Sequence, residues 1–137
     1  MTTTGPRGSY PRGFQFPNEG FVQEAIERYF ANRGLQIDEV GTADLACTDP
    51  KTAAKWIVEA KGETSSVGLD FRTGLGQLLQ QMTEPAINYA IAVPDTPQFR
   101  YQCERLSSWV RIALHLHLLL ISAEGEVRVV EPDSSIP

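Results

Sequence analysis

Apolar side chains recur at helical spacing in three parts of the chain. The first run lies between Asn18, a suitable N-cap, and Gly34, which suits the left-handed position after a helix. The second covers about residues 70–82 and stops before Pro85. The third begins at Pro97 and places five residues on one face: Phe99, Cys103, Leu106, Val110 and Ala113. The pattern predicts three helices.

Short apolar or alternating runs between these helices predict six strands. They cover residues 35–40, 44–48, 55–61, 88–93, 115–122 and 126–131. The alternation in the fifth strand places His115 and His117 together on a polar face, whereas Trp56 and Trp109 fit apolar periodic patterns typical of a core. The order α-β-β-β-α-β-α-β-β indicates one α/β domain with a mixed central sheet flanked by helices.

Two segments flank this domain, which spans residues 18–131. Residues 1–17 are rich in Gly, Pro, Thr and Arg and contain no acid, so they are predicted to form a flexible basic N-terminal arm that is able to contact a phosphate backbone. Residues 132–137 read as a polar tail. The length of 137 residues is ordinary for one domain.

Composition narrows the class of protein. A 42% hydrophobic chain can bury a core without disulfides, and the widely separated Cys47 and Cys103 are expected to be small buried side chains. No signal peptide is evident, and the longest apolar run, residues 112–121, is too short to span a bilayer. A soluble cytoplasmic protein with no membrane partner is the expectation. The net charge of −5 disfavours a strong nonspecific nucleic-acid binder, although a bound divalent cation would offset part of the acidic excess.

The candidate chemistry lies at the end of the third strand. Residues two apart in a strand share a face, so Glu59 and Lys61 are expected to lie side by side. A hairpin partner that carries Asp44 can add a second carboxylate. Two carboxylates suit Mg²⁺, with the backbone carbonyl of Ala60 as a further oxygen ligand. Lys61 can position a water or stabilise the charge that develops on phosphorus, so the group suits phosphodiester hydrolysis.

Glu-x-Lys alone is a weak signal, because an ordinary surface ion pair on a strand also explains it. The order of elements around this tripeptide is a helix, a hairpin, a second helix and an apolar strand. Together these elements, over about residues 18–93, resemble the αβββαβ core of the PD-(D/E)XK nuclease superfamily. The family's metal aspartate matches Asp44, its acidic metal ligand matches Glu59, and its catalytic lysine matches Lys61. The sequence departs from the family pattern at Ala43, where the motif has proline. The resemblance implies a restriction endonuclease-like fold, here with an added C-terminal helix and β-hairpin.

The resemblance implies two further site residues. Glu19, at the start of the first helix, matches the glutamate that many members direct to the metal through water, with Glu24 as runner-up. Gln77 matches the glutamine that resolvase-like members place after the lysine strand, where it holds the lysine, a water or a phosphate. Gly74 and Gly76 beside it suit either close approach of a nucleic-acid backbone or simple helix packing.

These observations predict an Mg²⁺-dependent phosphodiesterase, an endodeoxyribonuclease in which Mn²⁺ can substitute. Asp44, Glu59 and Lys61 are its central residues, supported by Gln77 and Glu19. DNA is the expected substrate, with RNA an open alternative, and a homodimer or a partner subunit is expected because so small a domain has little surface for reading bases. The rival hypothesis is a catalytically silent nuclease-fold module that binds protein or nucleic acid. A small-molecule enzyme ranks last, since no nucleophile–base pair or cofactor loop is evident.

Overall fold

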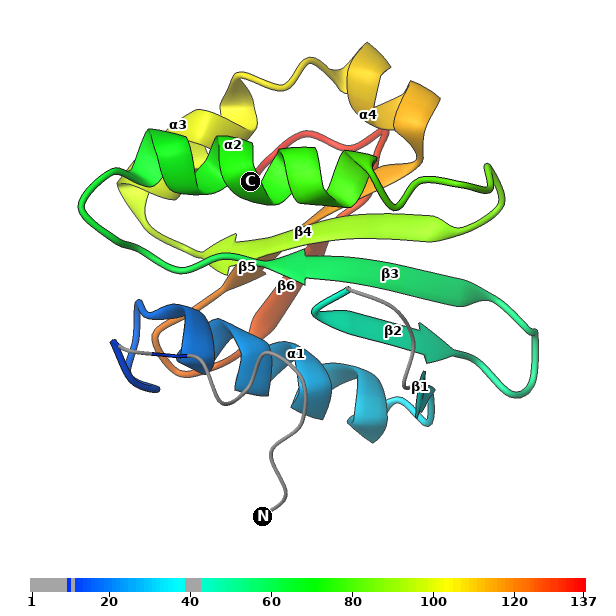
Figure 1. The fold of residues 1–137 in the computed structure, drawn as a ribbon. Coiled ribbons are helices and arrows are strands. Elements are labelled where there is room, and N and C mark those ends of the chain that lie inside the picture. The colour runs from blue at the N-terminus through cyan, green and yellow to red at the C-terminus, as the bar shows by residue number, and fades with distance from the viewer. Residues whose placement is uncertain (1–9, 11, 39–42) are drawn as a thin grey trace.

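The computed structural model describes Tyr10, residues 12–38 and residues 43–137, so Glu39 and Val40 of the first predicted strand lie outside the described residues. In these ranges, ten elements follow one another (Figure 1). They are α1 (Glu19–Asn32), β1 (Gln36–Asp38), β2 (Leu45–Thr48), β3 (Lys55–Ala60), α2 (Val67–Leu79), β4 (Asn88–Pro94), α3 (Pro97–Glu104), α4 (Ser108–Leu114), β5 (Leu116–Ile121) and β6 (Val127–Val130).

The six strands form one mixed sheet in the order β1-β2-β3-β4-β5-β6. β3 pairs with β4 and β4 with β5 in parallel, while the other three pairings are antiparallel. Parallel neighbours require crossover connections, which α2 supplies between β3 and β4 and α3 and α4 supply between β4 and β5. The predicted α/β fold with a mixed sheet flanked by helices is confirmed, and it is compatible with a restriction endonuclease-like fold.

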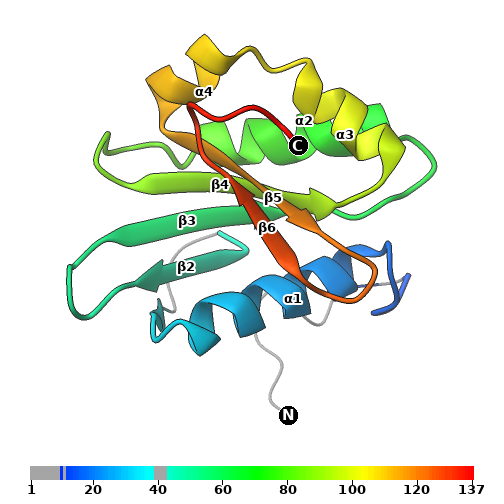
Figure 2. The same cartoon turned by 180° about the vertical axis from the view of Figure 1, so that it is seen from behind.

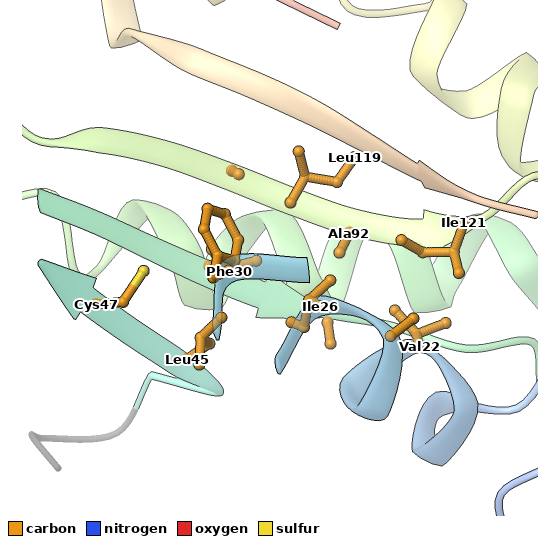
Figure 3. Packing of buried hydrophobic residues seen from close by; sticks show 12 residues of the cluster. Val22, Ile26, Phe30, Leu45, Cys47, Ala92, Leu119 and Ile121 are labelled. Atoms are coloured by element: carbon orange, nitrogen blue, oxygen red, sulfur yellow. The ribbon is translucent and has the colours of Figure 1, made fainter. Parts of the chain in front are cut away.

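One face of the sheet is covered by α1 (Figures 1 and 2). Its apolar stripe repeats every three or four residues, so one side of the helix packs continuously on the strands. Figure 3 shows this core. The buried cluster comprises Val22, Ala25, Ile26, Phe30, Leu45, Cys47, Val58, Ala60, Ala90, Ala92, Leu119 and Ile121.

The opposite face is covered by α2, α3 and α4. Buried residues of this second cluster include Phe71, Leu78, Tyr89, Ile91, Phe99 and Cys103. Val58 and Ala60 face α1, whereas Ile57 packs in the second cluster, so side chains of β3 alternate between the two helical layers. By the same alternation Glu59 faces α2.

The prediction of one long third helix is wrong. The chain forms α3 and α4 with a break at residues 105–107. The buried residue of α4 is Arg111, whose guanidinium donates to the carbonyls of Glu131 and Ser134. Because α4 turns this side chain inward, Ala113 is exposed and Trp109 is 71% exposed instead of lying in the core.

The two histidines also differ from expectation. His115 ends α4 in the left-handed conformation, with φ of 55°, and β5 begins only at Leu116. His117 is buried rather than on a polar face, and its Nδ1 lies 3.1 Å from the carbonyl oxygen of Tyr89. Its ring packs against Trp56 at 4.6 Å between centroids. The local alternation of residue types is therefore misleading, because the strand is buried on both faces.

The segment before α1 packs against the domain. The ring of Phe16 contacts that of Phe21 edge to face, and Glu63 donates its backbone N–H to the carbonyl of Pro17 at 2.9 Å. Residues 1–9 and 11 of the predicted arm lie outside the described residues. Within the described ranges, none of the helices combines the length and the apolar character that crossing a bilayer requires.

The start of α1 is fixed by a close approach to Gly62. A Cβ at position 62 would lie 2.0 Å from the backbone nitrogen of Glu19, so Gly62→Ala must displace the helix start. We expect this variant to lose about 1–3 kcal/mol of unfolding free energy. Gly76→Ala is the control, since its Cβ would meet nothing within 4 Å and should add about 0.5–1 kcal/mol. Urea denaturation measures both, and equal stability of the two variants would contradict the packing described.

Candidate metal and catalytic site

The β2–β3 hairpin places Asp44 opposite Glu59. Leu45 pairs with Val58, so one step further in the antiparallel register brings positions 44 and 59 together. Asp44 precedes β2, and its Oδ2 accepts the backbone N–H of Ala60 at 2.8 Å. A carboxylate bonded to the backbone of the neighbouring strand is held in one orientation toward its partner.

Glu59 is the buried member of the carboxyl pair, with 3% of its surface exposed. Burial, together with a hydrogen bond with Asp44 and the charge of Asp44, raises the pKa of Glu59 to about 8, while Gln81 and Lys61 oppose the shift. Glu59 therefore keeps a proton near neutral pH, beside the carboxyl group of Asp44. A divalent cation can replace that proton, so the two groups fit an Mg²⁺ site with oxygen ligands.

Lys61 follows β3 and continues its parallel pairing, because its backbone N–H donates to Ala92 at 2.9 Å. Its Nζ lies 3.9 Å from Oε1 of Glu19, which opens α1. The aliphatic part of Lys61 passes against Gly74, where a Cβ would approach its Cγ to 2.5 Å. Gly74 is therefore explained by packing against the lysine, whereas Gly76 faces open space.

Glu19 is less enclosed than Glu59, with a third of its side chain exposed. Burial raises the pKa of Glu19; the charge of Lys61 lowers it, and the charges of Asp44 and Asp70 raise it. Its first-turn position matches the positive end of the helix dipole, which favours a carboxylate there.

These side chains line one open cleft of about 680 Å³, formed by Glu19, Asp44, Glu59, Lys61, Gln77, Gln80 and Gln81. The structure thus brings all five predicted side chains together from α1, the start of β2, the end of β3 and α2. Ala60 is fully buried beside them, and its role as a carbonyl ligand stays a prediction. In Figure 1 the end of β3 lies between α1 and α2.

Three glutamines that the sequence did not single out, Gln81, Gln23 and Gln80, lie at the acidic pair or in the cleft wall. Gln81, not Gln77, donates to Oε1 of Glu59, at 2.5 Å, while Gln77 is exposed on the wall of the cleft. Gln23 of α1 is buried, and its Nε2 donates to the carbonyl of Asp44 at 2.7 Å. Gln80 adds to the cleft wall. The one sequence signal for Gln81 was its spacing of four from Gln77, which places both on one helix side.

No three His, Cys, Asp or Glu side chains among the described residues converge in the arrangement of a complete metal site. The donor set is instead two carboxylates, with the remaining positions of a cation left to water and backbone. Mg²⁺ commonly binds in this way, through one or two carboxylates and several waters. The residues present therefore fit this cation better than Zn²⁺, which prefers His and Cys ligands.

The fold and the cleft define a mixed α/β domain with an acidic pair and a lysine at the end of a central strand. Two crystal structures share this fold. An XisH family protein from Nostoc punctiforme PCC 73102 superposes with a TM-score of 0.56 at 19% identity, covering 80% of this chain and 98% of that one. An fdxN element excision controlling factor protein from Anabaena variabilis gives a TM-score of 0.57 at 21% identity, with the same coverage. At these identities the likeness shows the fold alone.

No protein-family model matches the chain, and no curated protein matches it.

The raised pKa of Glu59 makes stability depend on pH. Between its ordinary value near 4.5 and about 8, folded Glu59 keeps a proton that the unfolded chain has released. In the metal-free protein the free energy of unfolding should therefore fall as pH rises through this window, by up to about 1.4 kcal/mol per pH unit. Glu59→Gln removes this dependence, although the smaller contribution of Glu19 remains. Urea denaturation in chelator at several pH values measures the slope, and identical slopes would contradict the assignment.

Proposed function

We propose that this protein is a metal-dependent nuclease of the cytoplasm that hydrolyses phosphodiester bonds of DNA. The observation that carries the proposal is the meeting of the Asp44 and Glu59 carboxyl groups beside Lys61 in one open cleft. Structural ion pairs also place acids beside lysines. This cleft in addition buries a carboxyl group with a raised pKa beside a second acid, a combination typical of functional sites.

Asp44 and Glu59 are the residues that would hold Mg²⁺ or Mn²⁺, with the Ala60 carbonyl as a further oxygen. The cation supplies Lewis acidity at the scissile phosphate when bound. Lys61 donates hydrogen bonds either to the attacking water or to the phosphate oxygens as negative charge develops. The water oxygen would form a bond to phosphorus while the bond to the leaving oxygen breaks. The proton that the attacking water loses passes to solvent, and the leaving oxygen takes up a proton from solvent. Glu19 orients Lys61 from α1.

The charge of the chain bears on the substrate. In the part of the chain that the structure describes, the cleft is lined by one cation, Lys61, against three carboxyl groups, and the net charge of the chain is −5. Affinity for a nucleic acid must then come from the cation and from neutral donors such as the cleft glutamines, or from a partner subunit or second copy. We propose that the protein works as a homodimer or with a partner subunit, on DNA or, as the alternative polymer, on RNA.

A second candidate is a nuclease-fold module that assists other proteins without cleaving. The acidic net charge favours this candidate. One structural neighbour is named as an excision controlling factor, which describes control of excision rather than cutting. The two candidates differ in the behaviour of the metal: the module has no need of Mn²⁺, whereas the nuclease binds it and depends on it.

Cleavage of linear, branched and single-stranded DNA and of RNA with Mn²⁺ tests the proposal. We expect Glu59→Gln and Lys61→Met to lower the rate at least about 100-fold, because each loses a group that acts on the transition state. Glu59→Gln imitates the protonated acid in shape, so its stability at neutral pH should be kept.

Lys55→Met is the matched control for the lysine, since Lys55 is an exposed residue at the far end of the same strand. It should cleave like the wild-type protein. Mn²⁺ that neither binds nor supports cleavage of any substrate would favour the assisting module, and equal rates in all variants would remove the site assignment.

A further inference from the structure

Carboxyl groups in contact repel when both ionise, so their separation and orientation depend on donors around them. Glu59 receives such a donor from Gln81, which lies just after α2. The backbone N–H of Gln81 bonds to Leu78 at 2.9 Å, which fixes the start of its side chain. Its Nε2 also reaches the carbonyl of Gln77 at 3.3 Å. Because both partners are acceptors, the amide can present only its NH₂ group to Glu59.

Asp44 receives its support from the opposite helical layer. Nε2 of Gln23 in α1 donates to the backbone carbonyl of Asp44 at 2.7 Å and to Oε2 of Glu27 at 2.9 Å. Both partners are again acceptors, so the orientation of this amide is also settled. The bond ties the backbone at Asp44, where β2 is about to begin, to the helix that carries Glu19.

Gln23 occupies its position at a cost. It is 1% exposed, and its Oε1 is buried with no hydrogen-bond partner in the described structure. A buried acceptor without a partner is destabilising, and an apolar side chain of similar size would avoid that loss. An amide at this position is thus a poor choice for packing and a good one for holding Asp44.

We propose that Gln81 and Gln23 are positioning residues of the metal site, in which Gln81 secures the Glu59 carboxyl group and Gln23 secures the backbone of Asp44 from the opposite face of the sheet. The inference rests on the proposed function and adds the residues that set the metal affinity. Gln81 bonds Oε1 of Glu59, which would leave Oε2 available to a cation. Gln23 keeps the backbone of Asp44 in register, so its carboxylate stays opposite Glu59. Partners that orient metal ligands commonly change metal affinity about 10–100-fold.

Gln81→Met and Gln23→Met test this assignment, because methionine keeps the length of the side chain and removes the donor. We expect Mn²⁺ binding to the full chain, measured by calorimetric titration, to weaken about 10–100-fold in each variant. The loss of cleavage in each variant should be greatest at low Mn²⁺ and should shrink as Mn²⁺ is raised, because the amides act through the metal ligands. Gln98→Met, on the exposed surface of α3, is the control and should bind Mn²⁺ as the wild type does.

A purely structural role gives a different result. In that case the melting temperature falls while the Mn²⁺ affinity of the folded protein stays unchanged, which would overturn the inference. Gln81 lies at a half-buried helix end, so its variant keeps the test available even if Gln23→Met fails to fold. Unchanged Mn²⁺ affinity in Gln81→Met would refute the inference but leave the nuclease proposal intact. Wild-type protein that binds no Mn²⁺ would refute both.

Discussion

The structure is organised around a contact that electrostatics alone would oppose, that of the carboxyl groups of Asp44 and Glu59. Antiparallel pairing of β2 and β3 forces the two positions together, and burial keeps the Glu59 carboxyl largely neutral until a cation can take the place of its proton. Hydrogen bonds from Ala60 and Gln81 then fix the carboxyl orientations. A buried acidic pair of this kind fits a divalent ion, because a cation would relieve the repulsion between two ionised carboxylates.

The elements around this contact are placed by two unusually close approaches. Gly62 lets the start of α1 reach the end of β3, which brings Glu19 to Lys61. Gly74 lets the aliphatic part of Lys61 run beneath α2. A side chain at either position would separate a helix from the strand end. The absence of a Cβ atom at these two positions is therefore as necessary for the cleft as the charged groups that line it.

The C-terminal part of the chain, from α3 onward, is held in place by contacts outside the cleft. α3 and α4 complete the second helical layer, and the buried Arg111 holds the backbone of the last residues through the carbonyls of Glu131 and Ser134. No residue of this region lines the cleft. The Arg111 side chain faces inward and Trp109 faces outward, which is the reverse of what the hydrophobicity of these two residues alone would predict.

The local sequence pattern was enough to predict the α/β fold class, the alternation of side chains in β3 and the proximity of Asp44, Glu59 and Lys61. Strand periodicity and hairpin pairing are short-range properties, so they can be read from neighbouring residues. The local pattern was not enough to predict the roles of Gln81 and Gln23, because only the packing of helices on the sheet brings these amides to the Glu59 carboxyl group and to the backbone of Asp44. The break between α3 and α4 and the burial of Arg111 also depended on partners some twenty residues away. Tertiary structure decides such cases, since burial and hydrogen-bond partners are set by packing between distant segments and leave no periodic trace along the chain.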